Sequence, residues 1–141
     1  MAENVLPDYL RSGLDLVFVG FNASLKSAEI GYYYAGRGNQ FWPFLFEAGL
    51  TDRQLTPQED AQILGYKIGL TDIVKGRATR GIGDLTNDDY VSGFEVLREK
   101  MRKYRPRVVC FNGKSGYAKV VGEKRDYGVQ DELLEGARLF L

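Results

Sequence analysis

The chain contains four short runs of apolar residues that predict buried β-strands. They are Leu14 to Phe21, Tyr66 to Val74, Arg107 to Asn112, and Ala137 to Leu141. The first is nearly continuous in apolar residues and rich in β-branched ones, which is typical of a strand buried on both faces of a parallel sheet.

Helical patterns separate these runs. Predicted helices cover Gln40 to Ala48, Thr56 to about Leu64, Thr86 to Tyr104, and Tyr117 to Val121. The third is the clearest: one face carries the apolar residues Val91, Phe94, Leu97, Met101 and Tyr104 at spacings of three and four, and Pro106 ends the pattern. Strands that alternate with helices predict an α/β fold, a three-layer sandwich with a central four-stranded parallel sheet.

Composition narrows the possible chemistry. The 141 residues suit a single domain, and 19 basic residues balance 19 acidic ones, so a nucleic-acid partner would have to meet a local basic patch. The chain has no histidine and only Cys110 as cysteine, which excludes zinc sites, Cys-His pairs, Ser-His-Asp triads and an internal disulfide. The first residues form neither an export signal nor a membrane span, so we expect a soluble intracellular protein.

Polar residues follow three of the predicted strands, namely Asn22, Asp72 and Asn112. Ligands of parallel sheets bind beyond the carboxyl ends of the strands. An asparagine there can orient a water molecule, although asparagine is also common in tight turns for conformational reasons alone. Three successive tyrosines, Tyr32 to Tyr34, cannot all face a core. We expect at least one exposed ring that is able to stack on a flat ligand, and the alternative is that the rings only pack a loop.

Several segments together resemble the mismatch-specific uracil-DNA glycosylase and thymine-DNA glycosylase family. In chain order they are Gly20-Phe21-Asn22-Ala23-Ser24-Leu25, Gly31 to Ala35, Gly38-Asn39-Gln40-Phe41-Trp42, Ala48-Gly49-Leu50-Thr51 with Arg53-Gln54-Leu55, Gly69 to Val74, and Lys103-Tyr104-Arg105-Pro106 running into Phe111 to Lys114. The resemblance runs from Leu14 to about Tyr117. It implies a uracil-DNA glycosylase fold that acts on a flipped uracil, or thymine in some members, opposite guanine.

The resemblance also implies roles for single residues. Asn22 matches the asparagine that positions the hydrolytic water, Gly20 and Phe21 supply backbone around the pyrimidine, and Tyr34 matches the aromatic that stacks on the flipped base. Ser27 falls where the family lines the pocket near C5 of the pyrimidine. Asp72 falls beside the base, where it would either hydrogen-bond or act on the water or the sugar cation as a second catalytic group.

Three departures separate the chain from the family pattern. Ala23-Ser24 replaces a Pro-Gly pair, and the loop Lys75 to Arg80 carries one extra residue. The family continues beyond the position of Leu141 with an Asn-Pro-Ser-Gly wedge loop and a last helix. We therefore expect residues 1–141 to be a single glycosylase-like domain that is truncated at its C-terminus.

The expected partner is double-stranded DNA with a mispaired or damaged pyrimidine, bound by a monomer without a membrane. Lys75, Arg77 and Arg80 form a basic cluster at the expected rim of the site, and Asn112 and Lys114 would lie near phosphate. A second basic run, Arg98 to Arg107, is more typical of a solvated helix face.

The expected activity is that of a monofunctional uracil/thymine mismatch DNA glycosylase in base excision repair, which needs no metal or organic cofactor. We expect it in the cytoplasm with the nucleoid in a prokaryote, or in the nucleus of a eukaryote. Two alternatives stay open: a DNA-binding or base-binding module with weak or no catalysis, and a flavodoxin-like nucleotide-binding protein.

Overall fold

The computed structural model describes residues 5–80 and 84–141, with the side chains of Lys114 and Ser115 outside the description. Its sheet is built from β1 (Leu16–Ser24), β2 (Ile68–Thr79), β3 (Val108–Phe111), β4 (Val129–Leu134) and β5 (Ala137–Phe140). The strand order is β2-β1-β3-β5-β4, and the first four of these strands run parallel. The predicted four-stranded parallel sheet is therefore confirmed. The edge strand β4, antiparallel to β5, was not predicted.

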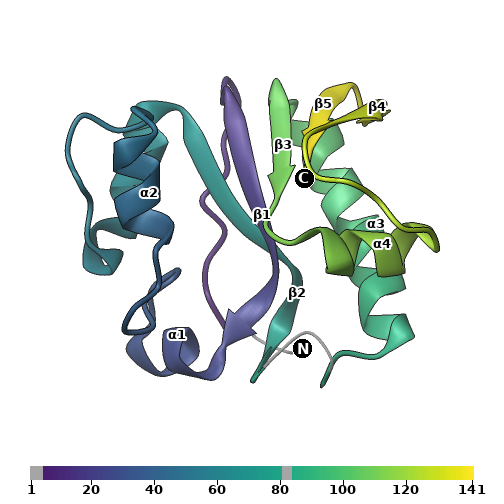
Figure 1. The fold of residues 1–141 in the computed structure, drawn as a ribbon, viewed down its shortest axis with the longest axis horizontal. Helices are drawn as coiled ribbons and strands as arrows, with labels where there is room; N and C mark the ends of the chain where they lie inside the picture. The colour runs from purple at the N-terminus through teal and green to yellow at the C-terminus, as the bar shows by residue number, and fades with distance from the viewer. Residues whose placement is uncertain (1–4, 81–83) are drawn as a thin grey trace.

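Helices cover both faces of the sheet, which confirms the three-layer sandwich (Figure 1). One side carries α1 (Leu25–Ile30), α2 (Phe41–Glu47) and the 3-10 helix η1 (Pro57–Tyr66), and the other carries α3 (Asn87–Tyr104) and α4 (Lys114–Val121). The helix predicted from Thr56 is thus of the 3-10 type. None of the helices described is both long and apolar enough to cross a bilayer.

Strand β1 separates two hydrophobic cores. Val17, Val19 and Phe21 point into the core beneath α3 and α4, while Phe18 packs against the core beneath α2. Successive side chains of a strand point to opposite faces. Gly20 therefore faces the α2 side, where it leaves space for a cavity.

Strand β2 is longer than predicted and is irregular. The segment predicted as a loop from Lys75 onwards continues the strand to Thr79, which corrects that expectation. Asn22 of β1 pairs with Val74, but Ser24 pairs with Thr79, so residues 75–78 form a bulge. A bulge of this kind bends a strand and redirects its side chains, and it occurs often beside active sites.

Helix α3 begins where the sequence predicted. The Thr86 hydroxyl accepts a hydrogen bond from the Asp89 N–H, and the Asp89 carboxylate accepts one from the Thr86 N–H. The predicted apolar face needs one correction, because Val91 is 63% exposed and Tyr90 is buried in its place. Tyr90 packs against the Phe21 ring, with ring centroids 6.2 Å apart.

Gly93 lets α3 approach β2 closely, and we expect Gly93→Ala to destabilise the protein. A Cβ at this position would lie 2.4 Å from the Ile73 carbonyl oxygen, which is backbone and cannot rotate away. Overpacking of this kind costs about 1–3 kcal/mol. Urea unfolding measures the loss. Gly65→Ala is the matched control, because its Cβ would meet nothing within 4 Å. Equal stability of the two variants would contradict the close packing.

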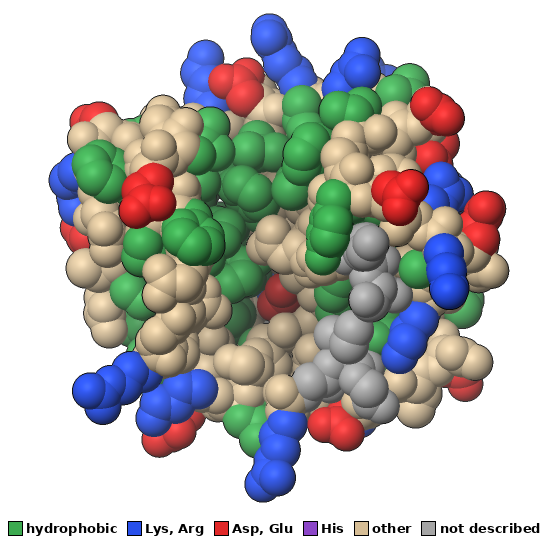
Figure 2. Space-filling model, in the orientation of Figure 1, with side chains coloured by type: hydrophobic (Ala, Val, Ile, Leu, Met, Phe, Trp, Pro, Cys, Tyr) green, Lys and Arg blue, Asp and Glu red, His purple; other side chains and the backbone are tan. Residues whose placement is uncertain are grey.

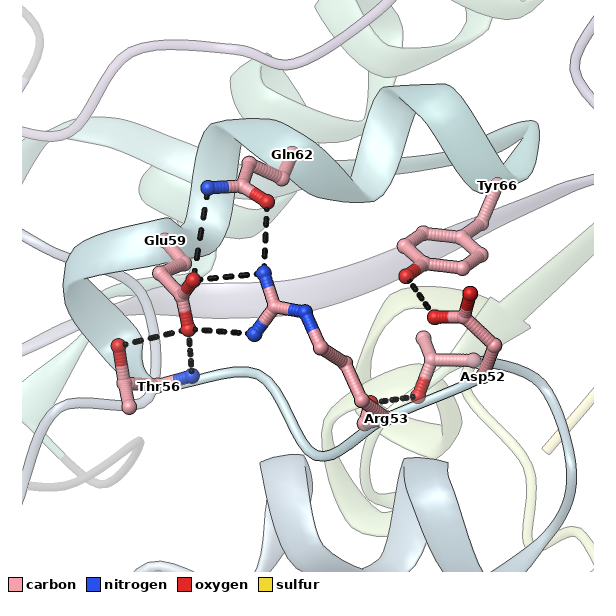
Figure 3. A network of polar contacts seen from close by, with 7 residues as sticks. Asp52, Arg53, Thr56, Glu59, Gln62 and Tyr66 are labelled. Atoms are coloured by element: carbon pink, nitrogen blue, oxygen red, sulfur yellow. Dashed lines mark hydrogen bonds and ion pairs between the residues drawn. The ribbon is translucent and has the colours of Figure 1, made fainter.

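A polar network fixes the segment between α2 and η1 (Figure 3). The Arg53 guanidinium donates to both Glu59 oxygens, at 3.0 and 2.7 Å, and also to Gln62. The bond from Arg53 is the main cause that lowers the pKa of Glu59 to about 2, and Glu59 also accepts from the Thr56 N–H. The network holds the first turn of η1, the element that carries the buried Asp60.

Candidate active site

A cavity of about 200 Å³ lies on the α2 side of the sheet, where β1 and β2 reach their carboxyl ends. Its lining residues are Leu6, Asn22, Ala23, Ser24, Ser27, Tyr33, Tyr34, Asn39 and Asp72. Figure 2 shows a hollow on this face of the molecule, with an acidic side chain at its floor and apolar side chains along its upper and left sides. The structure thus brings together Asn22, Ser27, Tyr34 and Asp72, which the sequence had proposed separately.

The Asn22 amide has a fixed orientation. Its Nδ2 donates to the Arg77 carbonyl oxygen at 3.2 Å and to the Thr79 hydroxyl at 2.9 Å. A carbonyl oxygen can only accept, so the amide nitrogen must face β2. The Oδ1 atom, an acceptor, is then the group that Asn22 can offer to a water molecule in the cavity. The bulge of β2 is what brings both acceptors to this position.

Asp72 lies directly opposite Gly20 on the neighbouring strand. A Cβ on Gly20 would lie 2.5 Å from Asp72 Oδ1 and 3.6 Å from the Tyr34 hydroxyl. The missing side chain is therefore what gives the carboxyl group its room. The Asp72 residue is only 6% exposed, and this burial is the largest cause that raises its pKa to about 6.

A cluster of charges lies behind Asp72. Asp8, in the N-terminal segment, accepts from the Thr71 hydroxyl at 2.6 Å and forms ion pairs with Lys75 at 3.2 Å and Lys100 at 2.6 Å. Burial opposes ionisation of Asp8, but the two lysines outweigh it and lower the Asp8 pKa. Toward Asp72 the lysines favour the ionised form and Asp8 opposes it, so their effects partly cancel.

Tyr34 forms one wall of the cavity with a backbone of positive φ, 51°. Its ring stacks on Phe41, with centroids 3.9 Å apart and planes at 25°. Its hydroxyl accepts a hydrogen bond of 2.6 Å from Asn112 Nδ2. Burial raises the Tyr34 pKa, so the phenol stays neutral. Asn112, predicted to lie near phosphate, is thus placed where it orients the aromatic ring.

Tyr33 anchors the loop that carries Tyr34. Its N–H donates to the buried carboxylate of Asp60 at 2.9 Å, and its carbonyl accepts from Trp42 Nε1 at 3.0 Å. Its hydroxyl donates to the Pro7 carbonyl and accepts from Lys75 Nζ, both at 2.7 Å. With every polar atom of Tyr33 engaged, the loop holds Tyr34 in one position.

Ser27 and Phe21 contribute in different ways. Ser27 is buried in α1 and lines the cavity, and its hydroxyl accepts from the Ala35 N–H at 3.1 Å. The N-cap of α1 is Ser24, whose hydroxyl accepts from the Ser27 N–H. The Phe21 ring points into the opposite core, so only its backbone can reach a ligand on the cavity side.

The three residues of the predicted basic cluster, Lys75, Arg77 and Arg80, have different environments in the structure. The Lys75 side chain is only 9% exposed and is paired with Asp8, which favours a structural role over phosphate contact. Arg77 holds the bulge to α3 through an ion pair with Asp89 at 2.9 Å, and it also donates to the carbonyl of Asp84, which precedes that helix, at 2.7 Å. Arg80 is exposed next to the bulge. The expected role of Lys114 falls on a side chain outside the described residues.

The second basic run, Arg98 to Arg107, is largely occupied by ion pairs. Arg98 and Arg102 both pair with Glu135, at 3.3 and 3.0 Å, and Arg107 pairs with Asp15 at 3.7 Å. These contacts favour the solvated, structural interpretation of the run.

A larger hollow of about 560 Å³ lies between the edge of β2 and α3. At its centre Asp8 pairs with both Lys75 and Lys100, so these charges already have protein partners. None of Asn22, Ser27, Tyr34 and Asp72 lines this hollow. We therefore assign the site to the smaller cavity. Across the described residues no cluster of three or more acidic or cysteine side chains is arranged to hold a metal ion.

Fold and cavity together define an α/β protein with a small ligand site at the carboxyl edge of a parallel sheet. A family profile described as the uracil DNA glycosylase superfamily matches residues 7–138, and the chain belongs to this family. Among solved structures, the chain is similar to the solution NMR structure of a "putative Uracil DNA glycosylase" from Methanosarcina acetivorans. The identity is 26% over 84% of this chain and 78% of that chain, with a TM-score of 0.49.

Proposed function

We propose that the protein is a monofunctional DNA glycosylase that hydrolyses the N-glycosidic bond of a flipped uracil, or thymine, in G·U or G·T mispairs. The main support for this proposal is a single cavity that is lined by the oriented amide of Asn22, the Tyr34 ring and the Asp72 carboxyl group. The cavity is smaller than the ~300–1,000 Å³ usual for drug-sized ligands, as suits a single planar ring. Family membership supports the reaction class.

The target nucleotide must leave the duplex to enter such a cavity, at a cost of a few kcal/mol that is lowest for a mispaired base. The base then stacks on Tyr34, whose opposite side is supported by Phe41. Cleavage produces an oxocarbenium-like sugar and a pyrimidine anion. Backbone N–H groups around Phe21 are our candidates for stabilising the anion.

Asn22 would orient the attacking water with Oδ1. An amide cannot remove a proton at neutral pH, so its contribution is position and polarity only. We therefore expect a slow enzyme, whose rate rests on the stability of the leaving anion.

Release of free base from a panel of oligonucleotides tests the proposal. We expect cleavage of U·G duplex to exceed that of U·A duplex, because the wobble pair costs less to open. Thymine differs from uracil by one methyl group, so cleavage of T·G duplex depends on whether the cavity has space for that group. Such a difference changes discrimination between two substrates by only ~1–3 kcal/mol. Single-stranded uracil completes the panel. Retention of U·G duplex in a gel shift without any base release would instead identify a base-binding module.

DNA binding should depend steeply on salt, with Arg80 as one phosphate contact. Neutralising a phosphate releases counterions, so Arg80→Gln is expected to lower the log–log salt slope by about one unit. Fluorescence anisotropy with U·G duplex measures the slope. Arg107→Gln is the matched control, because Arg107 precedes β3 at the amino edge of the sheet and its side chain is 83% exposed. Equal slopes for both variants would argue against Arg80.

A further inference from the structure

The N-terminal segment from Val5 to Tyr9 runs along the outer edge of β2 and forms part of the candidate site. The backbones of Tyr9 and Leu70 form an isolated antiparallel bridge, with two hydrogen bonds of 3.0 Å. Further along β2, the Val5 N–H donates to the Lys75 carbonyl at 2.8 Å. The segment therefore follows β2 to the end at which the cavity lies, and its residue Leu6 lines that cavity.

Leu6 lies between two neighbours that hydrogen bonds hold in place. Val5 precedes it, and after it the Pro7 carbonyl accepts from the Tyr33 hydroxyl at 2.7 Å. The next residue, Asp8, forms its ion pair with Lys75 on β2. Leu6 itself is only 2% exposed and belongs to the hydrophobic core beneath α2. Its side chain therefore presents a fixed apolar surface to the cavity.

Leu6 differs in kind from the other residues around the cavity. Of the described residues that line it, Leu6 alone has a large aliphatic side chain, while the others are polar, aromatic or, like Ala23, small. It also lies opposite Asn22. Strand β2 is the edge strand, with β1 and Asn22 on its inner side and the N-terminal segment on its outer side. A base whose sugar lies near Asn22 therefore has the far side of its ring toward Leu6.

The far side of a pyrimidine ring has one apolar position. O2, N3–H and O4 are polar, and an aliphatic side chain against any of them would leave that group unpaired in a buried site. The ring faces are apolar, and Tyr34 is our candidate for stacking on one of them. On the ring edge only C5 and C6 carry hydrogen on carbon. C6 is bonded to N1, which carries the sugar, so C5 is the apolar edge position that can reach the far side.

We propose that Leu6 is the wall of the cavity that meets C5 of the flipped base, and that it sets the largest 5-substituent which the site accepts. This inference rests on the proposed glycosylase function. Thymine carries a methyl group at C5 where uracil carries hydrogen. Leu6 is then a specificity-determining residue for the choice between these bases, supplied by a segment that precedes the first strand of the sheet.

The test compares duplexes that carry uracil, thymine or 5-ethyluracil opposite guanine. Single-turnover cleavage gives the rate for each 5-substituted base relative to uracil. Comparing this ratio between a variant and the wild type cancels the chemistry of the leaving group, because the bases are the same for both proteins. We expect Leu6→Ala to raise the ratio for the bulkier bases by about 10-fold or more, the scale for a missing methylene in an apolar pocket. Leu6→Val should give a smaller rise.

Leu55→Ala is the matched control. Leu55 is also 2% exposed and lies in the same hydrophobic core, but it is not among the residues that line the cavity. Its replacement removes the same atoms from the same core, so it should lower stability in urea unfolding while it leaves the ratio as in the wild type. If Leu6→Ala failed to fold, Leu6→Val, which removes only one methylene, would still decide.

An unchanged ratio in folded Leu6→Ala or Leu6→Val would overturn the proposal, as would an equal rise in Leu55→Ala. Equal cleavage of 5-ethyluracil and uracil by the wild type would also overturn it. Affinities for duplexes with 2′-fluoro nucleotides, which resist cleavage, give the same ratio without the chemistry. A shift of this affinity ratio in Leu6→Ala without base release from any duplex would refute the glycosylase function alone. Cleavage of U·G duplex with a ratio that does not depend on Leu6 would refute only the role of Leu6.

Discussion

Replacing Asn22 with alanine is expected to lower the single-turnover rate of uracil release from U·G duplex by about 10²-fold or more, the scale of removing one preorganised polar group from an active site. The reason is geometric. The Arg77 carbonyl and the Thr79 hydroxyl hold the Asn22 amide nitrogen, so its Oδ1 is committed to the cavity. Without this acceptor, water near C1′ loses its orientation, while stacking of the base on Tyr34 is retained. The rate constant should fall with little change in duplex affinity.

Variants of Thr79 provide the matched controls. Thr79→Val keeps the shape of the side chain but removes the acceptor for Asn22, while the Arg77 carbonyl still holds the amide in place. We expect a smaller loss than for Asn22→Ala, and recovery in Thr79→Ser. Unfolding curves check that all variants are folded. A wild-type rate in folded Asn22→Ala would end the assignment of Asn22.

The sequence was sufficient for those elements whose apolar patterns are local. The strand through Val17 and Val19 and helix α3 with its Thr86 cap both follow from short-range signals. Strand β4 was missed because it is an edge strand with exposed residues at every second position, Val129 and Leu133 among them. The extension of β2 past Val74 was missed because it depends on a bulge, which is fixed by pairing with β1 rather than by its own residues.

The residues of the candidate site differ in the same way: some were predicted from local sequence, and others reach the cavity only through tertiary contacts. Asn22 and Asp72 were found because each follows a strand at the carboxyl edge of the sheet. Leu6 and Tyr33 line the same cavity but come from an N-terminal segment and a loop that reach it only through tertiary contacts. The burial of Lys75 could not be predicted from the sequence, because it depends on an ion pair with Asp8 at 3.2 Å. Asp8 lies 67 positions earlier in the chain.

The cavity depends on the absence of a side chain at Gly20 and on the fixed position of Tyr34. The absence of a side chain at Gly20 gives room for the Asp72 carboxyl group, and the neighbouring Tyr34 is held by Asn112. The Asp72 residue is only 6% exposed, and its carboxyl group lines the cavity. Its free hydrogen-bonding capacity is directed to the cavity, and the folded state bears the energetic cost of that arrangement.

Asp72→Asn is therefore expected to stabilise the protein at neutral and higher pH. The pKa of Asp72 is about 6 in the folded state, against a usual value of 3.8, so the folded state binds the proton more tightly than the unfolded state does. Stability then falls as pH rises from about 4 to 6, and above that range the ionised, buried carboxylate costs up to about 3 kcal/mol, from roughly two pKa units at 1.36 kcal/mol each. Asparagine does not titrate and carries no such cost.

The gain from Asp72→Asn over the wild type should be largest above pH 6 and should shrink to nearly nothing below pH 4, where the Asp72 side chain is neutral in both folded and unfolded states. Urea unfolding at a series of pH values measures it, with equal m-values as the condition for comparison. Asp131→Asn should leave stability nearly unchanged at every pH, since Asp131 is exposed. A gain in Asp72→Asn that did not vary with pH would mean that shape, not charge, sets the stability of this site.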